Sequence, residues 1–146
     1  MLEQVLEKYP DQVKLIFLSF PLRNHRFAKK AAIAAFAAKK QGKFWEYHDR
    51  LFLNLKSLND QKFLQIAREL GLNMARFEKD MKDLKIAARI NQDIRLGAYL
   101  GVRATPTVLI NGSVSRARTL EALQVDVEKE LERARKNSVA KGEQKG

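Results

Sequence analysis

Two short β-rich segments on either side of a long stretch of helical periodicity limit most strongly how this chain can fold. Residues 13–20, VKLIFLSF, are an apolar run that ends at Pro21, which is typical of a strand buried on both faces. Residues 107–110 are a second run of this kind, and the apolar spacing between 24 and 100 is helical. The pattern therefore predicts an α/β protein that is mostly helical and has a small mixed sheet.

Breaks in the periodicity divide residues 24–100 into five predicted helices. The breaks lie at Gly42, around 57–60 and around 71–73, with a further helix boundary near residue 84. We expect Asp60 to cap the third helix, because an aspartate side chain can accept a hydrogen bond from a backbone N–H of the first turn. The predicted helices span 24–41, 44–52, 60–70, 74–84 and 85–100.

The two ends of the chain also have local signals. Residues 2–9 have amphipathic spacing that stops at Pro10, which predicts a short helix. Asn111-Gly112 is a strong hairpin signal, so residues 113–116 are expected to run antiparallel to 107–110. A closing helix is predicted for 119–136 with Thr119 as its cap, followed by a polar, disordered tail at 137–146.

Composition excludes several kinds of chemistry. The chain has 146 residues, enough for one core, and no cysteine, which excludes a disulfide, a thiolate nucleophile and a zinc site that uses sulfur. We expect no signal peptide, because Glu3 and Glu7 follow Met1 closely, and no membrane-spanning segment, because charges interrupt every apolar run before about 18 residues.

An excess of basic residues raises the possibility of a polyanionic partner. The chain has 28 Lys and Arg against 17 Asp and Glu, and residues 23–50 contain eight basic residues but only Glu46 and Asp49 as acids. These basic positions alternate with alanines at helical spacing, which favours a solvated helix face over a nucleic-acid site. We therefore expect no nucleic-acid partner, with polyanion binding kept as an alternative.

No other enzyme motif is present. His25 and His48 are the only histidines, and they have no third ligand at a metal-binding spacing, so both are interpreted as structural. The sequence also lacks the phosphate-loop, dinucleotide, zinc-protease and nucleophile-elbow patterns. We expect no metal and no cofactor.

Several strings together resemble the DsbA-like branch of the thioredoxin superfamily of thiol–disulfide oxidoreductases. They are Phe20-Pro21-Leu22 with His25, the segment 41–52 (QGKFWEYHDRLF), the segment 101–107 (GVRATPT), and Ile110-Asn111-Gly112. Each string alone is a weak signal. Their order and spacing extend the resemblance over about residues 2–135.

The resemblance implies a single thioredoxin-like domain over 1–136 with a helical insertion at about 24–100. It also implies a cis bond between Thr105 and Pro106, in a loop where Ala104, Thr105 and Pro106 bind an extended peptide or unfolded protein. Many members of that family are periplasmic or exported. Nothing in this sequence encodes a location.

The chain departs from the family at the place where the chemistry would occur. Members of the family have an opening strand and then a Cys-X-X-Cys motif at the start of the helix whose last turns correspond to residues 2–9, and both are absent here. Arg116 stands where many relatives have glycine. The predicted fold is thus an incomplete, truncated thioredoxin-like fold, and the predicted chain has no catalytic residue and is redox-inactive.

In the family, the missing strand would lie between residues 13–20 and 107–110. We expect either direct antiparallel pairing of these two segments or a homodimer formed by strand exchange, since buried backbone groups need hydrogen-bond partners. Three functions follow: a redox-inactive member of the oxidoreductase family, a non-enzymatic peptide-binding module, or a basic protein that binds polyanions.

Overall fold

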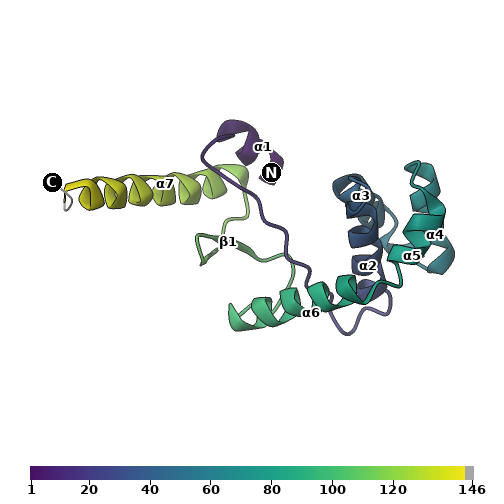
Figure 1. Ribbon diagram of the computed structural model, residues 1–146. Helices are drawn as coiled ribbons and strands as arrows, with labels where there is room; N and C mark the ends of the chain where they lie inside the picture. The colour runs from purple at the N-terminus through teal and green to yellow at the C-terminus, as the bar shows by residue number, and fades with distance from the viewer. Residues whose placement is uncertain (144–146) are drawn as a thin grey trace. The chain divides into compact units, whose positions relative to one another are not determined.

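The computed structural model describes residues 1–143, with side chains described as far as residue 137, and it contains two compact units (Figure 1). The terminal unit combines residues 1–17 with the chain from 102 onward, and the helical unit comprises 18–101. The helical unit nearly coincides with the insertion expected at 24–100.

The terminal unit is built from two helices and one hairpin. They are α1 (Leu2–Lys8), β1 (Val108–Ile110), β2 (Ser113–Ser115) and α7 (Leu120–Glu143). Val5 of α1 is buried with Leu123 and Val127 of α7 in a small apolar core. At the edge of this core the Lys8 ammonium lies 3.1 Å from the Glu128 carboxylate, so that apolar and ionic contacts both hold α1 against α7.

The predicted hairpin is confirmed. Val108, Leu109 and Ile110 pair antiparallel with Ser115, Val114 and Ser113 respectively. The turn uses the left-handed backbone region at both central residues, with φ of 48° at Asn111 and 86° at Gly112. Asn and Gly tolerate this region, and its twist matches that of the flanking strands, which explains why this dipeptide makes a two-residue turn.

Helix α7 begins as predicted and is longer than predicted. The Thr119 hydroxyl accepts a hydrogen bond of 3.2 Å from the Ala122 N–H, which confirms Thr119 as the cap. The helix then continues to Glu143, beyond the expected end at residue 136 and into the segment expected to be disordered. Residues 144–146 of that expected tail lie outside the described part of the chain.

The strand predicted at 13–20 is not part of a sheet. Within residues 1–143 the sheet has two strands, β1 and β2, and it is antiparallel rather than mixed. Residues 13–20 have no regular secondary structure and belong to no ladder, so the expected direct pairing with 107–110 does not form. One reason is local: the Ser19 N–H is taken by the carboxylate of Asp93 at 3.1 Å instead of by a neighbouring strand.

The helical unit contains the five predicted helices, with ends shifted by a few residues. They are α2 (Ala28–Lys39), α3 (Phe44–Leu53), α4 (Asp60–Glu69), α5 (Met74–Asp80) and α6 (Leu84–Tyr99), with a short 3₁₀ turn, η1 (Leu55–Ser57), after α3. The C-terminal half of α2 is almost entirely buried, because its alanines let neighbouring helices approach closely. The other large core side chains include Tyr47, Phe63, Ile66, Phe77 and Ile90.

The predicted cap of α4 is wrong by one residue. Asn59, in extended conformation, accepts a hydrogen bond of 2.8 Å from the Lys62 N–H, and Asp60 is the first residue inside the helix. Asp60 instead pairs with Lys30 of α2 at 2.7 Å. Both side chains can cap a helix, and the backbone conformation decides which of them does.

Packing on α6 fixes the start of the helical unit. The Asp93 side chain is 3% exposed and bonds both the Ser19 N–H and the Arg89 guanidinium. One turn further on, Phe20 lies over Gly97, where an added Cβ would come within 2.6 Å of the ring. Residues 19 and 20 are therefore held against α6 by a hydrogen bond and by close ring packing.

The surface of α3 carries an exposed aromatic stripe. Trp45 and Phe52 are 47% and 60% exposed, and the imidazole of His48 lies between them with ring centroids 5.5 Å and 4.7 Å away.

Over the described residues, no helix has the length and apolar character required to cross a bilayer.

Candidate peptide-binding loop

The candidate site is the loop that leads into β1 in the terminal unit. Ala104, Thr105 and Pro106 are all exposed, and the Thr105–Pro106 peptide bond is cis. The loop is braced from inside by the Thr107 hydroxyl, which donates a hydrogen bond of 2.6 Å to the Ala104 carbonyl. β1 begins two residues after Pro106, so the hairpin anchors the C-terminal end of the loop.

The backbone of this loop is available to a ligand. Within residues 1–143, no hydrogen bond to another residue engages the N–H or C=O of Thr105. Pro106 has no N–H, so the loop cannot extend the β1–β2 ladder through that residue. Exposed backbone donors and acceptors beside a strand are what an extended peptide uses when it adds to a sheet edge.

The loop has no group that could carry out thiol chemistry. Thiol–disulfide exchange requires a thiolate that attacks a disulfide sulfur, and the chain contains no cysteine. The charged side chain next to the loop is Arg103, which is exposed and cannot serve as a base. The loop therefore exposes backbone groups but has no cysteine nucleophile of its own.

The two histidines lie apart from this loop in the sequence and belong to the helical unit. The Nδ1 of His48 is 3.0 Å from the carboxylate of its neighbour Asp49, while His25 is exposed in the turn before α2. No group of three His, Cys, Asp or Glu side chains in the described part of the chain is arranged to hold a metal ion.

The basic stretch 23–50 is partly neutralised by ion pairs within the helical unit. Half of its eight basic residues contact a carboxylate, at distances of 2.7 to 3.4 Å. The pairs are Lys30 with Asp60, Lys40 with Asp80 and Asp83, Lys43 with Glu46, and Arg50 with Glu69. Much of this charge is therefore balanced locally, which weakens the argument for a polyanion site.

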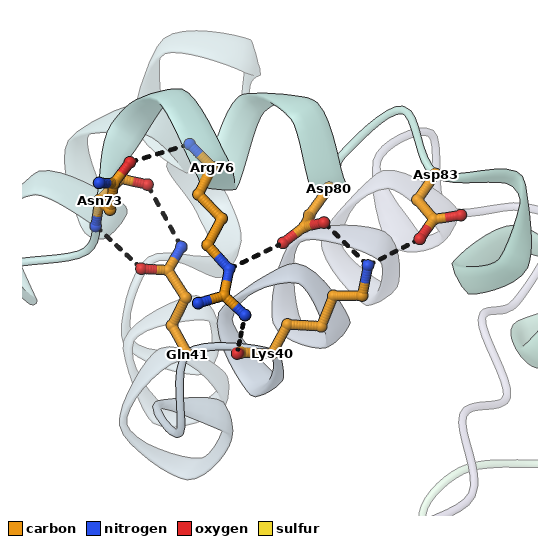
Figure 2. A network of polar contacts seen from close by, with 6 residues as sticks. All are labelled: Lys40, Gln41, Asn73, Arg76, Asp80 and Asp83. Atoms are coloured by element: carbon orange, nitrogen blue, oxygen red, sulfur yellow. Dashed lines mark hydrogen bonds and ion pairs between the residues drawn. The ribbon is translucent and has the colours of Figure 1, made fainter.

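A polar network that the sequence did not reveal joins the end of α2 to α5 and to the start of α6 (Figure 2). The Lys40 ammonium bonds the Asp80 carboxylate at 2.8 Å and the Asp83 carboxylate at 2.7 Å. The Arg76 guanidinium donates to the Lys40 carbonyl at 2.8 Å and lies 3.8 Å from Asp80. Beside them the Gln41 side-chain amide makes two hydrogen bonds to the backbone of Asn73.

The charges of this network stabilise one another. The hydrogen bonds that Lys40 donates to Asp80 and Asp83 raise the pKa of Lys40, because they favour the ammonium form. The hydrogen bond from Lys40, followed by one from the Lys85 N–H, lowers the pKa of Asp83. The residues are far apart in sequence and carry no motif, so only the folded arrangement identifies them. Asp80 Oδ2 is buried without a hydrogen bond and lies 3.8 Å from the Arg76 guanidinium.

Comparison with known proteins decides the family. The sequence model of the thioredoxin family matches residues 1–129, which is most of the chain. The chain belongs to the thioredoxin family. A thioredoxin-like oxidoreductase from Silicibacter pomeroyi has a similar crystal structure, with a TM-score of 0.73 and 27% sequence identity over 92% of this chain and 75% of that chain. The thioredoxin-like, mostly helical fold is thus confirmed.

Among curated proteins, the thioredoxin-family chain is similar to parts of much longer sequences. It is 38% identical over 101 residues to Na(+)/H(+) antiporter NhaA 3 of Salinispora tropica, and 30% identical over 119 residues to Na(+)/H(+) antiporter NhaA of Herminiimonas arsenicoxydans. These matches cover 68% and 79% of this chain but 16% and 19% of the relatives. The chain spans less than a fifth of the length of these relatives.

Proposed function

We propose that this chain is a thioredoxin-family module of the DsbA-like branch that binds extended polypeptide at residues 104–106 and does not itself exchange disulfides. The observation that carries the proposal is the exposed loop beside β1, whose Thr105 backbone groups have no partner among the described residues. The strings at 41–52 and 101–107 support the DsbA-like branch. The absence of cysteine from the sequence supports the lack of thiol chemistry.

The first experiment measures redox activity directly. The purified chain is assayed for the reduction of insulin by dithiothreitol and for the oxidation of a peptide dithiol. We expect both rates to equal the uncatalysed background, because catalysis of either reaction by the chain requires a protein thiolate. A rate that rises with protein concentration would contradict the proposal.

The second experiment tests the loop. Binding of a fluorescently labelled, reduced and alkylated α-lactalbumin is measured for the parent chain, for Pro106→Ala and for Pro10→Ala. Alanine restores an N–H and frees φ, so the loop backbone can rearrange, and we expect Pro106→Ala to weaken binding about ten-fold, or about 1.4 kcal/mol. Pro10 is exposed in the same unit and outside the loop, and Pro10→Ala should bind like the parent. Equal affinities for all three chains would remove residues 104–106 from the site.

A further inference from the structure

Three arginines without ion pairs border the loop at residues 104–106 in the terminal unit. Residues 102–118 contain Arg103, Arg116 and Arg118 but no aspartate or glutamate. All three arginines are exposed. The ion pairs of the terminal unit lie on α1 and α7, and none within residues 1–137 includes these arginines. This part of the unit therefore has three positive charges that no carboxylate of the described residues contacts.

Two of these arginines lie at the two ends of the loop. Arg103 directly precedes Ala104 in the chain. At the other end, Val108 pairs with Ser115, and the next residues outside the ladder are Thr107 and Arg116. Neighbouring chains of a sheet are about 5 Å apart, so Arg116 lies beside Thr107, where the loop joins β1.

Hydrogen bonds fix the backbone that carries Arg116 and Arg118. The Ser115 hydroxyl donates to the Asp126 carboxylate of α7 at 2.7 Å and accepts a hydrogen bond of 3.2 Å from the Ala117 N–H. Residue 118 then directly precedes Thr119, the cap of α7. The two arginines therefore extend from an anchored segment, and their positions relative to the loop are set by the hairpin and by α7.

We propose that the polypeptide bound at residues 104–106 is acidic, and that Arg103, Arg116 and Arg118 pair with its carboxylates. This inference rests on the proposed function, because it names the class of polypeptide that the same loop accepts. An extended peptide puts every second side chain on one face, so alternate acidic residues would meet the arginines along one side. A guanidinium can bind a carboxylate through two parallel N–H···O bonds, which makes the pairing directional.

A nucleic-acid strand offers phosphates to the same arginines but fits the loop less well. Proteins that bind single strands commonly stack the bases on aromatic side chains, and residues 102–118 contain no aromatic residue. A nucleic acid also has no peptide backbone to pair with the N–H and C=O groups of Thr105. Exposed peptide groups beside arginines without ion pairs therefore favour an acidic polypeptide.

The test compares three peptides of equal length that differ only in charge. Peptides in which Thr alternates with Glu, Gln or Lys, each labelled with tetramethylrhodamine, are titrated with the full chain at low and at high salt, and binding is followed by fluorescence anisotropy. We expect the Glu peptide to bind at least about five-fold more tightly than the Gln peptide at low salt. The Lys peptide should bind most weakly, and high salt should remove most of the difference, because salt screens exposed charges.

The outcomes separate this inference from the proposed function. Equal affinities for the Glu and Gln peptides, both weakened by Pro106→Ala, would overturn the acidic preference and leave peptide binding at the loop intact. Binding of no peptide at millimolar protein would overturn both.

Variants locate the acidic preference. Arg116→Gln and Arg135→Gln each remove one exposed arginine of the terminal unit, and residue 135 lies about 24 Å along α7 from Thr119. Arg116→Gln should weaken binding of the Glu peptide about three-fold, whereas Arg135→Gln should leave it unchanged. Replacing Arg103, Arg116 and Arg118 together by glutamine should bring the affinities for the Glu and Gln peptides within about two-fold of each other. Equal losses for Arg116→Gln and Arg135→Gln would mean that the overall positive charge attracts the peptide, and the proposal would fail.

Two further measurements cover misfolding of the variants and phosphate binding. Replacing the same three arginines by glutamate should reverse the preference, so that the Lys peptide binds more tightly than the Glu peptide, which an unfolded chain would not reproduce in a Pro106-dependent way. A preference for the Glu peptide in that variant would contradict the proposal. Oligothymidine is used as a competitor, and if it displaces the labelled Glu peptide at lower concentration than the unlabelled Glu peptide does, the arginines form a phosphate site and the proposal is overturned.

Discussion

At the scale of single residues, Asp93 and Gly97 show how two residues of α6 determine the path of the segment before α2. Asp93 is buried and takes the Ser19 N–H as a hydrogen-bond donor, while Gly97 leaves room for the Phe20 ring. Neither residue forms a motif, and they lie more than 70 positions along the chain from their partners. The run at 13–20 predicted a strand because its composition is β-rich, but composition does not show that a carboxylate would replace a neighbouring strand at Ser19.

Gly97→Ala is expected to destabilise the protein by about 1–3 kcal/mol, because the new Cβ would lie 2.6 Å from the Phe20 ring and force it to move. The free energy of unfolding is measured by urea denaturation. In a Phe20→Ala background the clash is absent, and the same glycine change should stabilise α6 by up to about 1 kcal/mol through helix propensity. If Gly97→Ala changed the free energy of unfolding with the same sign in both backgrounds, the proposed contact would be refuted.

At the scale of helices and strands, local signals predicted most of what the structure shows. The five helices of the helical unit, the hairpin at Asn111-Gly112 and the Thr119 cap follow from residues adjacent in sequence. The errors occur where two local signals compete or where the partner is distant. Asn59 and Asp60 are both good caps. Helix α7 continues past residue 136 to Glu143, although Asn137 is of a type often found just after a helix.

The capping of α4 gives a direct test with a built-in control. Asn59→Ala removes the acceptor of the Lys62 N–H and should lower the free energy of unfolding by about 1 kcal/mol. Asp60→Ala removes only a solvent-exposed pair with Lys30, which is worth a few tenths of a kcal/mol. The free energy of unfolding of both variants is measured by urea denaturation. A larger loss of stability for Asp60→Ala than for Asn59→Ala would reverse the assignment of the cap.

The network around Lys40 predicts how stability depends on pH. The pKa of Asp83 is lowered in the folded chain, so its contribution is present above its unfolded pKa and is lost as the pH falls through the lower folded value. Asp83→Asn keeps a side-chain oxygen that can cap α6 and removes the charge. We expect the parent to lose more stability than Asp83→Asn between pH 6 and pH 3 in urea titrations, and parallel losses would contradict this.

At the scale of the whole molecule, the thioredoxin-like class could be predicted from the order of local strings, while the arrangement of the sheet could not. A sheet is specified by contacts between distant segments, and the mixed sheet inferred from 13–20 and 107–110 is replaced by the β1–β2 hairpin alone among the described residues. The role of the loop at 104–106 stays a prediction from its sequence string. The network at Lys40 emerged only from the fold.

The exposed tryptophan of α3 is an intrinsic fluorescent probe of unfolding. Trp45 is the only tryptophan in the sequence, and it lies in the helical unit. Tyr9, which directly follows α1, belongs to the terminal unit. Tryptophan emission during denaturation therefore reports on residues 18–101, whereas far-ultraviolet circular dichroism reports on the helices of both units. Coincident transitions would mean that both units melt together, and separate transitions would give each unit its own stability.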